Sequence, residues 1–579
     1  FIQPRSDSYL GEYVPQSDSR LEWICGFSGS AGEILILRNL VLLFVDSRYT
    51  IQAINETKNT GIKVVLSSKV SLTDYIENNL NKFKNIAFDP WLHSFSKIKH
   101  LFNIGRKHNL NFIELKKNPI DLIWVSNREL TPKTEIKKHL LKYAGMSTAD
   151  KIKKLCLNLE TLNVDSYLIT QPDAIAWLLN IRGSDLKHTP IILTRAIIFK
   201  NQKLCLFIDK SRISSEIKNY FKKELINIKI YPENKLLDSI NKIAKTKNKI
   251  LIDPNTTSFV LANEILKTNN NNIIEQYCPI ELMKAIKNKI EIRGSILAHK
   301  KDGVALSKFL YWIYNSKNTN NSEILFSKKI DHLRSQQKNF ICTSFETISG
   351  FASNGAVVHY RVTNNSSKKI KGNSLYLCDS GGQYLEGTTD VTRTIAIGNP
   401  TKQMKKHFTI VLKSHIALAS AVFPYGTTGN ELDLLTRSPL WKNDMDYGHG
   451  TGHGVGSCLS VHEGPHRISK GSFITLEPGM ITSNEPGFYL ENQYGIRIEN
   501  LMVVTKLNDK KNKNMLGFKT LTLAPIDINL INYKLLTNEE IKWINNYNSH
   551  VYKNISIYLD SSIKTWLKKI CKPFVQTTH

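Results

Sequence analysis

The feature that most constrains the fold is a pattern that occurs twice in the first half of the chain. Each copy has a tryptophan, a Gly-Ser pair and two apolar runs that end in aspartate, the second followed by proline. In the first copy these are Trp23, Gly29-Ser30, Asp46 and Asp89-Pro90, and in the second they are Trp177, Gly183-Ser184, Asp209 and Asp253-Pro254. Six residues lead from Trp to Gly in both copies, and the aspartates lie 43 and 44 residues apart. This internal repeat predicts two homologous domains.

The apolar runs of each copy indicate buried strands, and polar stretches with helical periodicity, such as residues 215–223, lie between them. Strands that alternate with helices predict an α/β fold. We expect the first domain at residues 1–138 and the second at residues 139–280. Ser147 follows the first boundary and offers an N-terminal cap for a new helix.

A third domain is expected at residues 281–579, after Pro279 and from the start of a long helical pattern over 281–314. A chain of 579 residues exceeds the roughly 250–300 that one core supports, so several domains are expected on size alone. Gly, His, Asp and Glu cluster between residues 350 and 500, and neither repeat copy has such a cluster. The third domain is therefore expected to carry the chemistry, with the repeated pair as scaffold, oligomer interface or substrate gate.

The net charge of +28 arises from 78 basic and 50 acidic residues. The lysines are spread among asparagines and isoleucines, as in 267–272 and 508–514, which is typical of exposed surface and predicts no nucleic-acid partner. No apolar run approaches the roughly 18 residues of a membrane span, so no membrane association is expected. The eight cysteines form no Cys-x-x-Cys pair and indicate free thiols in a cytoplasmic protein.

Five side chains that can bind metal ions stand in order in the third domain, namely Asp379, Asp390, His453, Glu485 and Glu499. The two aspartates flank a predicted hairpin. A loop centred near Tyr384 and Leu385 would place them directly opposite each other on neighbouring strands. Two carboxylates that face each other repel unless a cation lies between them.

The other three candidates lie beside strands and turns. Glu499 ends the strand pattern at 495–499. Side chains alternate along a strand, so Arg497 lies on the same face as Glu499 and is expected to be a neighbour of the site. Glu485 precedes the Pro486-Gly487 turn after another strand pattern.

His453 lies in a glycine-rich run, 448–456, that could let the backbone approach a bound group. The run lacks the G-x-G-x-x-G and GK[ST] spacings of nucleotide sites. Each motif alone is explained by a turn or a cap, and it is the set that predicts a metal site.

Together these motifs resemble the pita-bread metallopeptidases, and among them the three-domain Xaa-Pro aminopeptidases, or aminopeptidases P. The resemblance extends from residues 11–13 and 26–32 to residues 523–526 and 543–547. It implies an α/β fold with two homologous N-terminal domains, creatinase N-terminal-like and ribonuclease H-like, followed by a pita-bread catalytic domain. It also implies a homodimer and two divalent ions, most often Mn²⁺, which suits oxygen-rich ligation.

The resemblance assigns roles to individual residues. Asp390 and Glu499 would bridge the two metals, Asp379 would complete one site, and His453 with Glu485 the other. Three further positions match the family's active-site histidines, namely His359, His449 and His462. The assignment of His359 rests on the resemblance alone.

The implied reaction is hydrolysis of the bond between any N-terminal residue and a penultimate proline, by a hydroxide that both metals hold. Glu485 is the candidate that carries a proton to the leaving proline nitrogen, while His462 and His359 would stabilise the oxyanion. Cys378 and Cys458 lie near ligands in the sequence and could make the site sensitive to oxidation.

Three alternatives share parts of the pattern. A prolidase would have the same five ligands but would accept only dipeptides. A methionine aminopeptidase would share them too, but the long repeated N-terminal pair argues against it. Pita-bread domains that only bind a partner have lost the metals, so the presence of all five ligands argues against that class.

Overall fold

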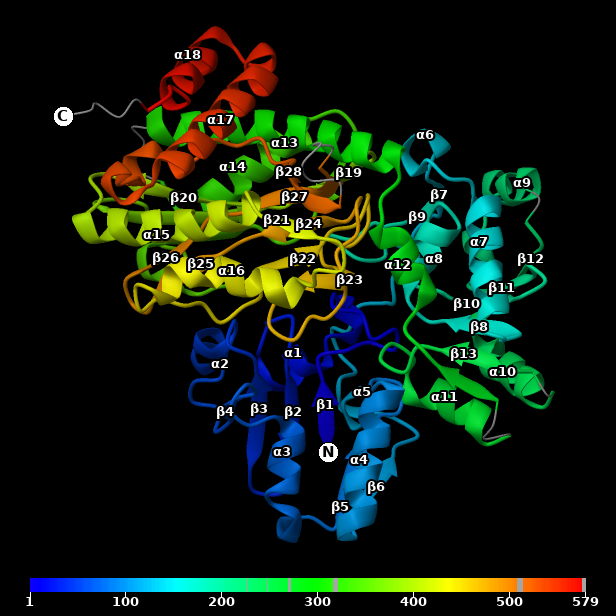
Figure 1. Ribbon diagram of the computed structural model, residues 1–579. Coiled ribbons are helices and arrows are strands. Elements are labelled where there is room, and N and C mark those ends of the chain that lie inside the picture. The colour runs from blue at the N-terminus through cyan, green and yellow to red at the C-terminus, as the bar shows by residue number, and fades with distance from the viewer. Residues whose placement is uncertain (225, 247, 269–271, 316–320, 508–513, 575–579) are drawn as a thin grey trace. The chain divides into compact units, whose positions relative to one another are not determined.

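The computed structural model describes residues 1–224, 226–246, 248–268, 272–315, 321–507 and 514–574 (Figure 1). Most of the lysine- and asparagine-rich stretches at 267–272 and 508–514 therefore lies outside the described residues. The chain forms two compact units, one of Phe1–Leu141 with Met146–Met283 and one of Lys142–Gly145 with Lys284–His579. The first unit contains both copies of the repeat.

The two copies of the repeat form six-stranded sheets with equivalent strand orders, β4-β3-β2-β1-β5-β6 and β12-β11-β10-β8-β13-β14. In both sheets the three innermost pairings run antiparallel, antiparallel and parallel in the same order. The first sheet consists of β1 (Ile2–Pro4), β2 (Glu33–Ile36), β3 (Val41–Val45), β4 (Lys63–Leu66), β5 (Asn85–Phe88) and β6 (Asn111–Glu114). The second consists of β8 (Ser166–Ile169), β10 (Arg195–Phe199), β11 (Leu204–Phe207), β12 (Ile228–Tyr231), β13 (Ile250–Ile252) and β14 (Ile273–Glu275). The predicted repeat of an α/β domain is confirmed.

The aspartates of the repeat have a structural role. Each follows a strand, and its Oδ1 accepts a hydrogen bond from the backbone amide two residues later, as Asp89 does from Trp91 and Asp253 from Asn255. The same turn occurs at Asp46 and Asp209. Such side-chain turns end a strand and redirect the chain.

The copies pack together through equivalent helices, α4 (Phe95–His108) and α11 (Phe259–Leu266). Phe95 N donates to Thr257 O at 2.9 Å, and Phe259 N donates to His93 O at 2.8 Å. This reciprocal pairing gives the two copies one continuous apolar core, in which the Phe88 and Phe259 rings meet edge to face. The other long helices of the unit include α7 (Thr148–Thr161), which Ser147 caps as predicted, and α9 (Ser215–Lys223) and α10 (Leu236–Ala244).

The predicted helix over 281–314 is interrupted. It forms α12 (Pro279–Ala285) and α13 (Lys289–Asn315). The side chain of Asn288 accepts hydrogen bonds from the amides of Ile290 and Glu291, so it starts α13 as a new helix. The periodicity continues across the break, which is why the sequence pattern did not reveal it.

The second unit is built from antiparallel strands covered by long helices (Figure 1). Its largest sheet has the order β21-β28-β27-β24-β22-β23. These strands are β21 (Val422–Pro424), β22 (Gly452–Gly454), β23 (Glu463–Ile468), β24 (Ile481–Asn484), β27 (Asn500–Lys506) and β28 (Met515–Thr520). Smaller sheets contain β15 (Phe340–Thr343), β16 (Ile348–Phe351), β17 (Ser374–Ser380), β18 (Gly382–Tyr384), β19 (Gly387–Thr388), β20 (Val391–Ile397), β25 (Gly487–Leu490) and β26 (Tyr494–Arg497). The helices are α13, α14 (Glu323–Ser335), α15 (Lys402–Ala419), α16 (Gly429–Trp441), α17 (Asn538–Ile555) and α18 (Ser561–Ile570).

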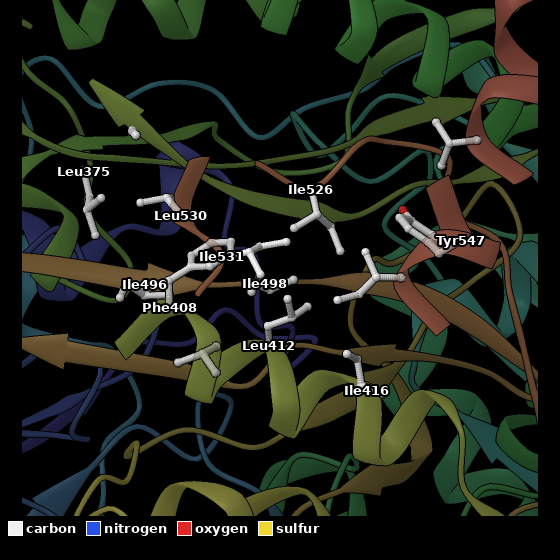
Figure 2. Close-up of a cluster of buried hydrophobic side chains, with 14 of the residues drawn as sticks. Leu375, Phe408, Leu412, Ile416, Ile496, Ile498, Ile526, Leu530, Ile531 and Tyr547 are labelled. Atoms are coloured by element: carbon white, nitrogen blue, oxygen red, sulfur yellow. The ribbon is translucent and has the colours of Figure 1, made fainter. Parts of the chain in front are cut away.

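One apolar cluster anchors α15 to the strand that leads into the candidate site (Figure 2). Phe408, Leu412 and Ile416 recur every four residues along α15 and form one helix face. They lie in the same buried cluster as Ile496 and Ile498. Because side chains alternate along an extended chain, Arg497 and Glu499 are directed to the opposite face. Among the described residues, no helix has both the length and the apolar character needed to cross a membrane.

Candidate active site

Asp379 and Asp390 lie on one hairpin, but the predicted register is wrong. Asp379 is the last but one residue of β17 and pairs with Thr392 of β20, two residues beyond Asp390. The same register continues through β18 and β19, where Tyr384 pairs with Gly387, so the turn is at Leu385 and Glu386. The turn is one residue later than expected, and this makes the two aspartates diagonal instead of directly opposite neighbours.

Glu485 and Glu499 lie at matching positions of a second, interrupted hairpin. Asn484 of β24 pairs with Asn500 of β27, and Gly487 of β25 pairs with Arg497 of β26 in the same register. Both glutamates fall in the gap between these two ladders. The predicted strand over 495–499 therefore ends at Arg497, two residues before Glu499.

The gap lets each glutamate amide bind a different neighbour. Glu485 N donates to Thr451 O at 2.9 Å, and Glu499 N donates to Thr392 O at 3.2 Å. Thr451 leads into the strand of His453, and Thr392 is on the strand that follows Asp390. The backbone thus connects the two glutamates to the segments that carry two other predicted ligands.

The glycines around His453 allow neighbouring strands to pack closely. A Cβ atom at Gly452 would lie 2.1 Å from Ser483 O, and one at Gly454 would lie 2.3 Å from Glu463 O. These close approaches bring β22 against its neighbours β24 and β23. At Gly452 and Gly454 the absence of a side chain serves strand packing, and the expected approach of the run to a bound group stays a prediction.

The His453 ring is oriented by its own backbone. Nδ1 lies 2.9 Å from Gly454 O, which can only accept, so Nδ1 carries the proton and Nε2 is left as a possible ligand atom. Nε2 lies 3.5 Å from Asp390 Oδ2 and 3.4 Å from Glu485 Oε1. Ser483 Oγ donates to Glu485 Oε1 at 3.0 Å and accepts from His453 N at 2.9 Å, which ties the two residues together.

The structure brings the five predicted ligands close together, with Asp379, Asp390 and Glu499 buried and His453 and Glu485 half-buried. Asp390, His453 and Glu499 each offer a ligand atom within 4.8 Å of the others. Within the described part of the chain, Oδ1 of Asp379 and Oδ1 of Asp390 are buried without a hydrogen-bond partner. Buried carboxylate oxygens without donors are costly unless a cation satisfies them, so this donor set fits bound metal ions.

The pKa values reflect the crowding of negative groups. Burial is the main cause that raises the pKa of Asp379, to about 7; Arg497 opposes the rise, while the charges of Asp390 and Glu485 contribute to it. Burial and the neighbouring carboxylates likewise raise the pKa of Glu485 and of Glu499. For His453, burial lowers the pKa, but Asp390 and Glu485 outweigh it and raise the value to about 9. When no metal ion is bound, protons on these carboxyl groups and on His453 reduce the repulsion that a cation would otherwise relieve.

Arg497 lies at the centre of the hydrogen bonds that orient the carboxylates. Its Nη2 donates to Asp379 Oδ2 at 2.6 Å, and its Nη1 donates to Tyr489 Oη at 2.6 Å. Its Nε donates to Thr392 Oγ1 at 3.1 Å, which in turn donates to Glu499 Oε2 at 2.8 Å. Arg497 is therefore placed as expected, as a neighbour of the carboxylates.

The three predicted histidines lie around this cluster. His449 Nε2 is 2.8 Å from Tyr489 Oη, so Tyr489 links this histidine to Arg497. The His462 ring centre is 4.4 Å from that of His453, with the planes nearly perpendicular. His359 follows Val358, whose carbonyl accepts from Arg497 Nη2 at 3.4 Å.

The sequence analysis did not identify Thr392, Tyr489 and Ser483. Thr392 stands two residues after Asp390 and Ser483 two residues before Glu485, so strand alternation could have placed both on the ligand face. Nothing in the sequence distinguishes Tyr489. The hypothesis that Cys378 and Cys458 are sensitive to oxidation finds no support, because both are buried and burial raises the pKa of the Cys378 thiol to about 11.

Comparison with known proteins agrees with this arrangement. The model of metallopeptidase family M24 matches residues 296–506, and that of the C-terminal region of peptidase M24 matches residues 514–574. Models of the creatinase/prolidase N-terminal domain match residues 10–117 and 127–291. Aminopeptidase P1 of Lotus japonicus is 34% identical, over 99% of this chain and 96% of its own. A probable Xaa-Pro aminopeptidase P of Laccaria bicolor is 36% identical, over 99% of this chain and 90% of its own.

The chain belongs to the Xaa-Pro aminopeptidase family of metallopeptidases. It is thus an enzyme of the hydrolase class.

Solved structures extend the comparison to the fold. The crystal structure of X-prolyl aminopeptidase from Caenorhabditis elegans, described as a cytosolic enzyme with a dinuclear active site, superposes with a TM-score of 0.93 at 32% identity. The match covers 99% of this chain and 95% of that one. The Xaa-Pro dipeptidase from Bacillus anthracis, at 23% identity and a TM-score of 0.51, shares the fold over 66% of this chain. The expected Xaa-Pro aminopeptidase fold, with paired N-terminal domains and a pita-bread catalytic domain, is confirmed.

Proposed function

We propose that this chain removes the N-terminal residue from peptides with proline in the second position, using two divalent metal ions. The observation that carries the proposal is the cluster in which ligand atoms of Asp390, His453 and Glu499 lie within 4.8 Å of one another. The dinuclear site named for the C. elegans relative supports the number of ions.

The ligands would divide between the two ions. Asp379, Asp390, His453, Glu485 and Glu499 would together hold both ions. Four carboxylates carry four negative charges when ionised, which two divalent cations would neutralise. When bound, the ions would supply a Lewis acid that activates a water for attack on the scissile carbonyl. Oxygen ligands with one imidazole suit Mn²⁺, which we propose as the resident ion.

Proton transfer would fall to the residues of the chain itself. Glu485 is the proposed carrier of a proton to the leaving proline nitrogen, and burial raises the pKa of its carboxyl, which favours the protonated form. His462 and His359 would donate hydrogen bonds to the oxyanion, and His449 would contact the peptide. Arg497 would keep Asp379 ionised and correctly oriented.

Three further properties of the protein are proposed. The domain boundaries are proposed at 138/139 and 280/281. A cytoplasmic location fits eight free cysteines and the cytosolic relative. A homodimer fits helix α16, which exposes three large apolar side chains, Leu434, Leu435 and Trp441. Sedimentation of the protein and of Leu434→Glu would test this, because a charge within an interface would convert dimer to monomer.

The test of the activity compares three peptides with the protein loaded with Mn²⁺. We expect release of arginine from Arg-Pro-Pro, no release from Arg-Ala-Ala, and loss of cleavage after chelation. Cleavage of the dipeptide Arg-Pro but not of Arg-Pro-Pro would identify a prolidase. Absence of cleavage by protein with both ions bound would contradict the proposal.

A further inference from the structure

Asn484 and Asn500 form a cross-strand pair next to the two glutamates of the site. Glu485 follows Asn484 in the chain, and Glu499 precedes Asn500. His415 of α15 contacts both members of this pair. Its Nδ1 lies 3.1 Å from Asn484 O, and its Nε2 lies 3.1 Å from Asn500 Nδ2. Asn484 Nδ2 donates in return to His415 O at 2.9 Å. One helix residue therefore holds the residues that precede Glu485 and follow Glu499.

The hydrogen bonds define the tautomer of His415. Asn484 O can only accept, so Nδ1 carries the proton, and Nε2 accepts from Asn500. Burial, together with the charge of Arg393, lowers the pKa of this ring to about 3, so the ring is neutral at pH 7. Both contacts of the ring are thereby fixed.

A second buried residue holds Glu499 from the other side. Arg393 Nη1 donates to Glu499 O at 2.6 Å and to Thr392 O at 2.8 Å, and its Nη2 donates to Asn500 Oδ1 at 2.8 Å. These acceptors are neutral oxygens. Arg393 is 3% exposed, and its positive charge therefore remains available to attract the Glu499 carboxylate.

Arg393 is in turn held by the C-terminal region of the chain. Its Nη2 donates to Tyr547 Oη at 2.8 Å and to Ala524 O at 2.8 Å, and Tyr547 Oη donates to Ala524 O at 2.7 Å. Tyr547 lies on α17 and stacks on Trp543, which meets the His415 ring edge to face. Helices α15 and α17 thus meet through His415 and Trp543, and both contribute to the apolar cluster of Figure 2.

We propose that His415 and Tyr547 are positioning residues of the metal site, which act through Asn500 and Arg393 to fix Glu485 and Glu499. The C-terminal region matched at 514–574 is then part of the active site, although none of its residues is among the five ligands. The inference rests on the proposed function, because it concerns the affinity of that same site for metal. Residues that orient ligands typically change metal affinity or activity about 10–100-fold when replaced.

The experiment titrates metal-free protein with Mn²⁺ by calorimetry for the wild type, His415→Phe and Tyr547→Phe. Tyr552→Phe is the matched control, because it removes a hydroxyl from the same helix away from the network. We expect Mn²⁺ affinity to fall about 10-fold or more in His415→Phe and Tyr547→Phe and to be unchanged in Tyr552→Phe. At saturating Mn²⁺ the KM for Arg-Pro-Pro should be unchanged, while kcat falls if the glutamates remain displaced.

Near-UV circular dichroism establishes that each variant is folded. If His415→Phe does not fold, the Mn²⁺ affinity of Tyr547→Phe alone tests the inference. Folded variants that bind Mn²⁺ within twofold of the wild type would overturn the inference. Failure of the wild type to bind Mn²⁺ or to cleave Arg-Pro-Pro would instead overturn the proposed function, so the two failures are distinguishable.

Discussion

Arg497 donates a hydrogen bond of 2.6 Å from Nη2 to Oδ2 of Asp379, and both side chains are almost fully buried. This pair opposes the burial that raises the pKa of Asp379 to about 7. Arg497 thus favours the ionised form of Asp379 as long as no metal is bound.

Replacement of this cation should weaken metal binding in a pH-dependent way. In Arg497→Met the pKa of Asp379 rises above about 7, so at pH 7 a proton competes with the metal. We expect at least about 10-fold weaker Mn²⁺ binding at pH 6.5 and a smaller loss at pH 8.5. Titration calorimetry at both pH values measures this, with Arg293→Met on the exposed side of α13 as control. Equal affinities of variant and wild type at both pH values would show that Arg497 does not control Asp379.

The metal-free protein should lose stability as the pH rises. The folded-state pKa of Asp379 is raised from 3.8 to about 7, and that of His453 from 6.5 to about 9. A raised folded-state pKa contributes stability below the unfolded value that is lost as the pH passes the folded value. We expect the Tm of metal-free protein to fall by about 3 °C or more between pH 5 and pH 9, and that of Mn²⁺-loaded protein to fall less. Calorimetric scans that show the metal-free protein more stable at pH 9 would contradict this sign.

His462 should contribute to turnover without contributing to metal binding. Its ring lies beside His453 but does not belong to the three-residue cluster of ligand atoms. In His462→Ala we expect kcat to fall about 100-fold or more, because an oxyanion donor is lost, with metal content unchanged by elemental analysis. His332→Ala, on an exposed face of α14, is the control. Full turnover, or loss of metal, would refute the proposed role.

Glu463 should stabilise the segment that carries His462. The Glu463 carboxylate is buried. Its Oε2 lies 3.3 Å from Lys284 Nζ, and its Oε1 contacts Lys287 Nζ. Glu463→Gln leaves two buried cations without their carboxylate, which should cost about 3–5 kcal/mol in the free energy of unfolding. The same change at the exposed pair of Glu346 with Arg361 should cost under about 1 kcal/mol. Urea unfolding of both variants gives the comparison, and equal losses would show that burial of the pair is unimportant.

The sequence was sufficient for features that depend on local pattern. The repeat was visible because turn-forming aspartates such as Asp89 and Asp253 must follow strands of fixed length. The strand pattern before Glu485 corresponds to β24, but where a turn was expected at Pro486 and Gly487 the chain continues into β25 in the same register. The family itself was recognisable from the set of five candidate ligands.

Features that depend on register or on distant contacts were not visible. The turn at Leu385 and Glu386 has none of the Asn-Gly or Asp-Gly signals that would locate it, so the diagonal placement of the aspartates was missed. Tyr547 lies 154 residues from the Arg393 that it contacts, and no periodicity connects them. Only the folded chain brings α17 behind Glu499.

The most direct test of the central claim follows two quantities in one titration. Metal-free protein receives Mn²⁺ in steps, and the bound Mn²⁺ per chain is measured together with arginine release from Arg-Pro-Pro. The account predicts two ions per chain at saturation and full activity only as the second ion binds. Full activity with one ion bound, or activity that does not depend on Mn²⁺, would contradict a dinuclear site built from Asp379, Asp390, His453, Glu485 and Glu499.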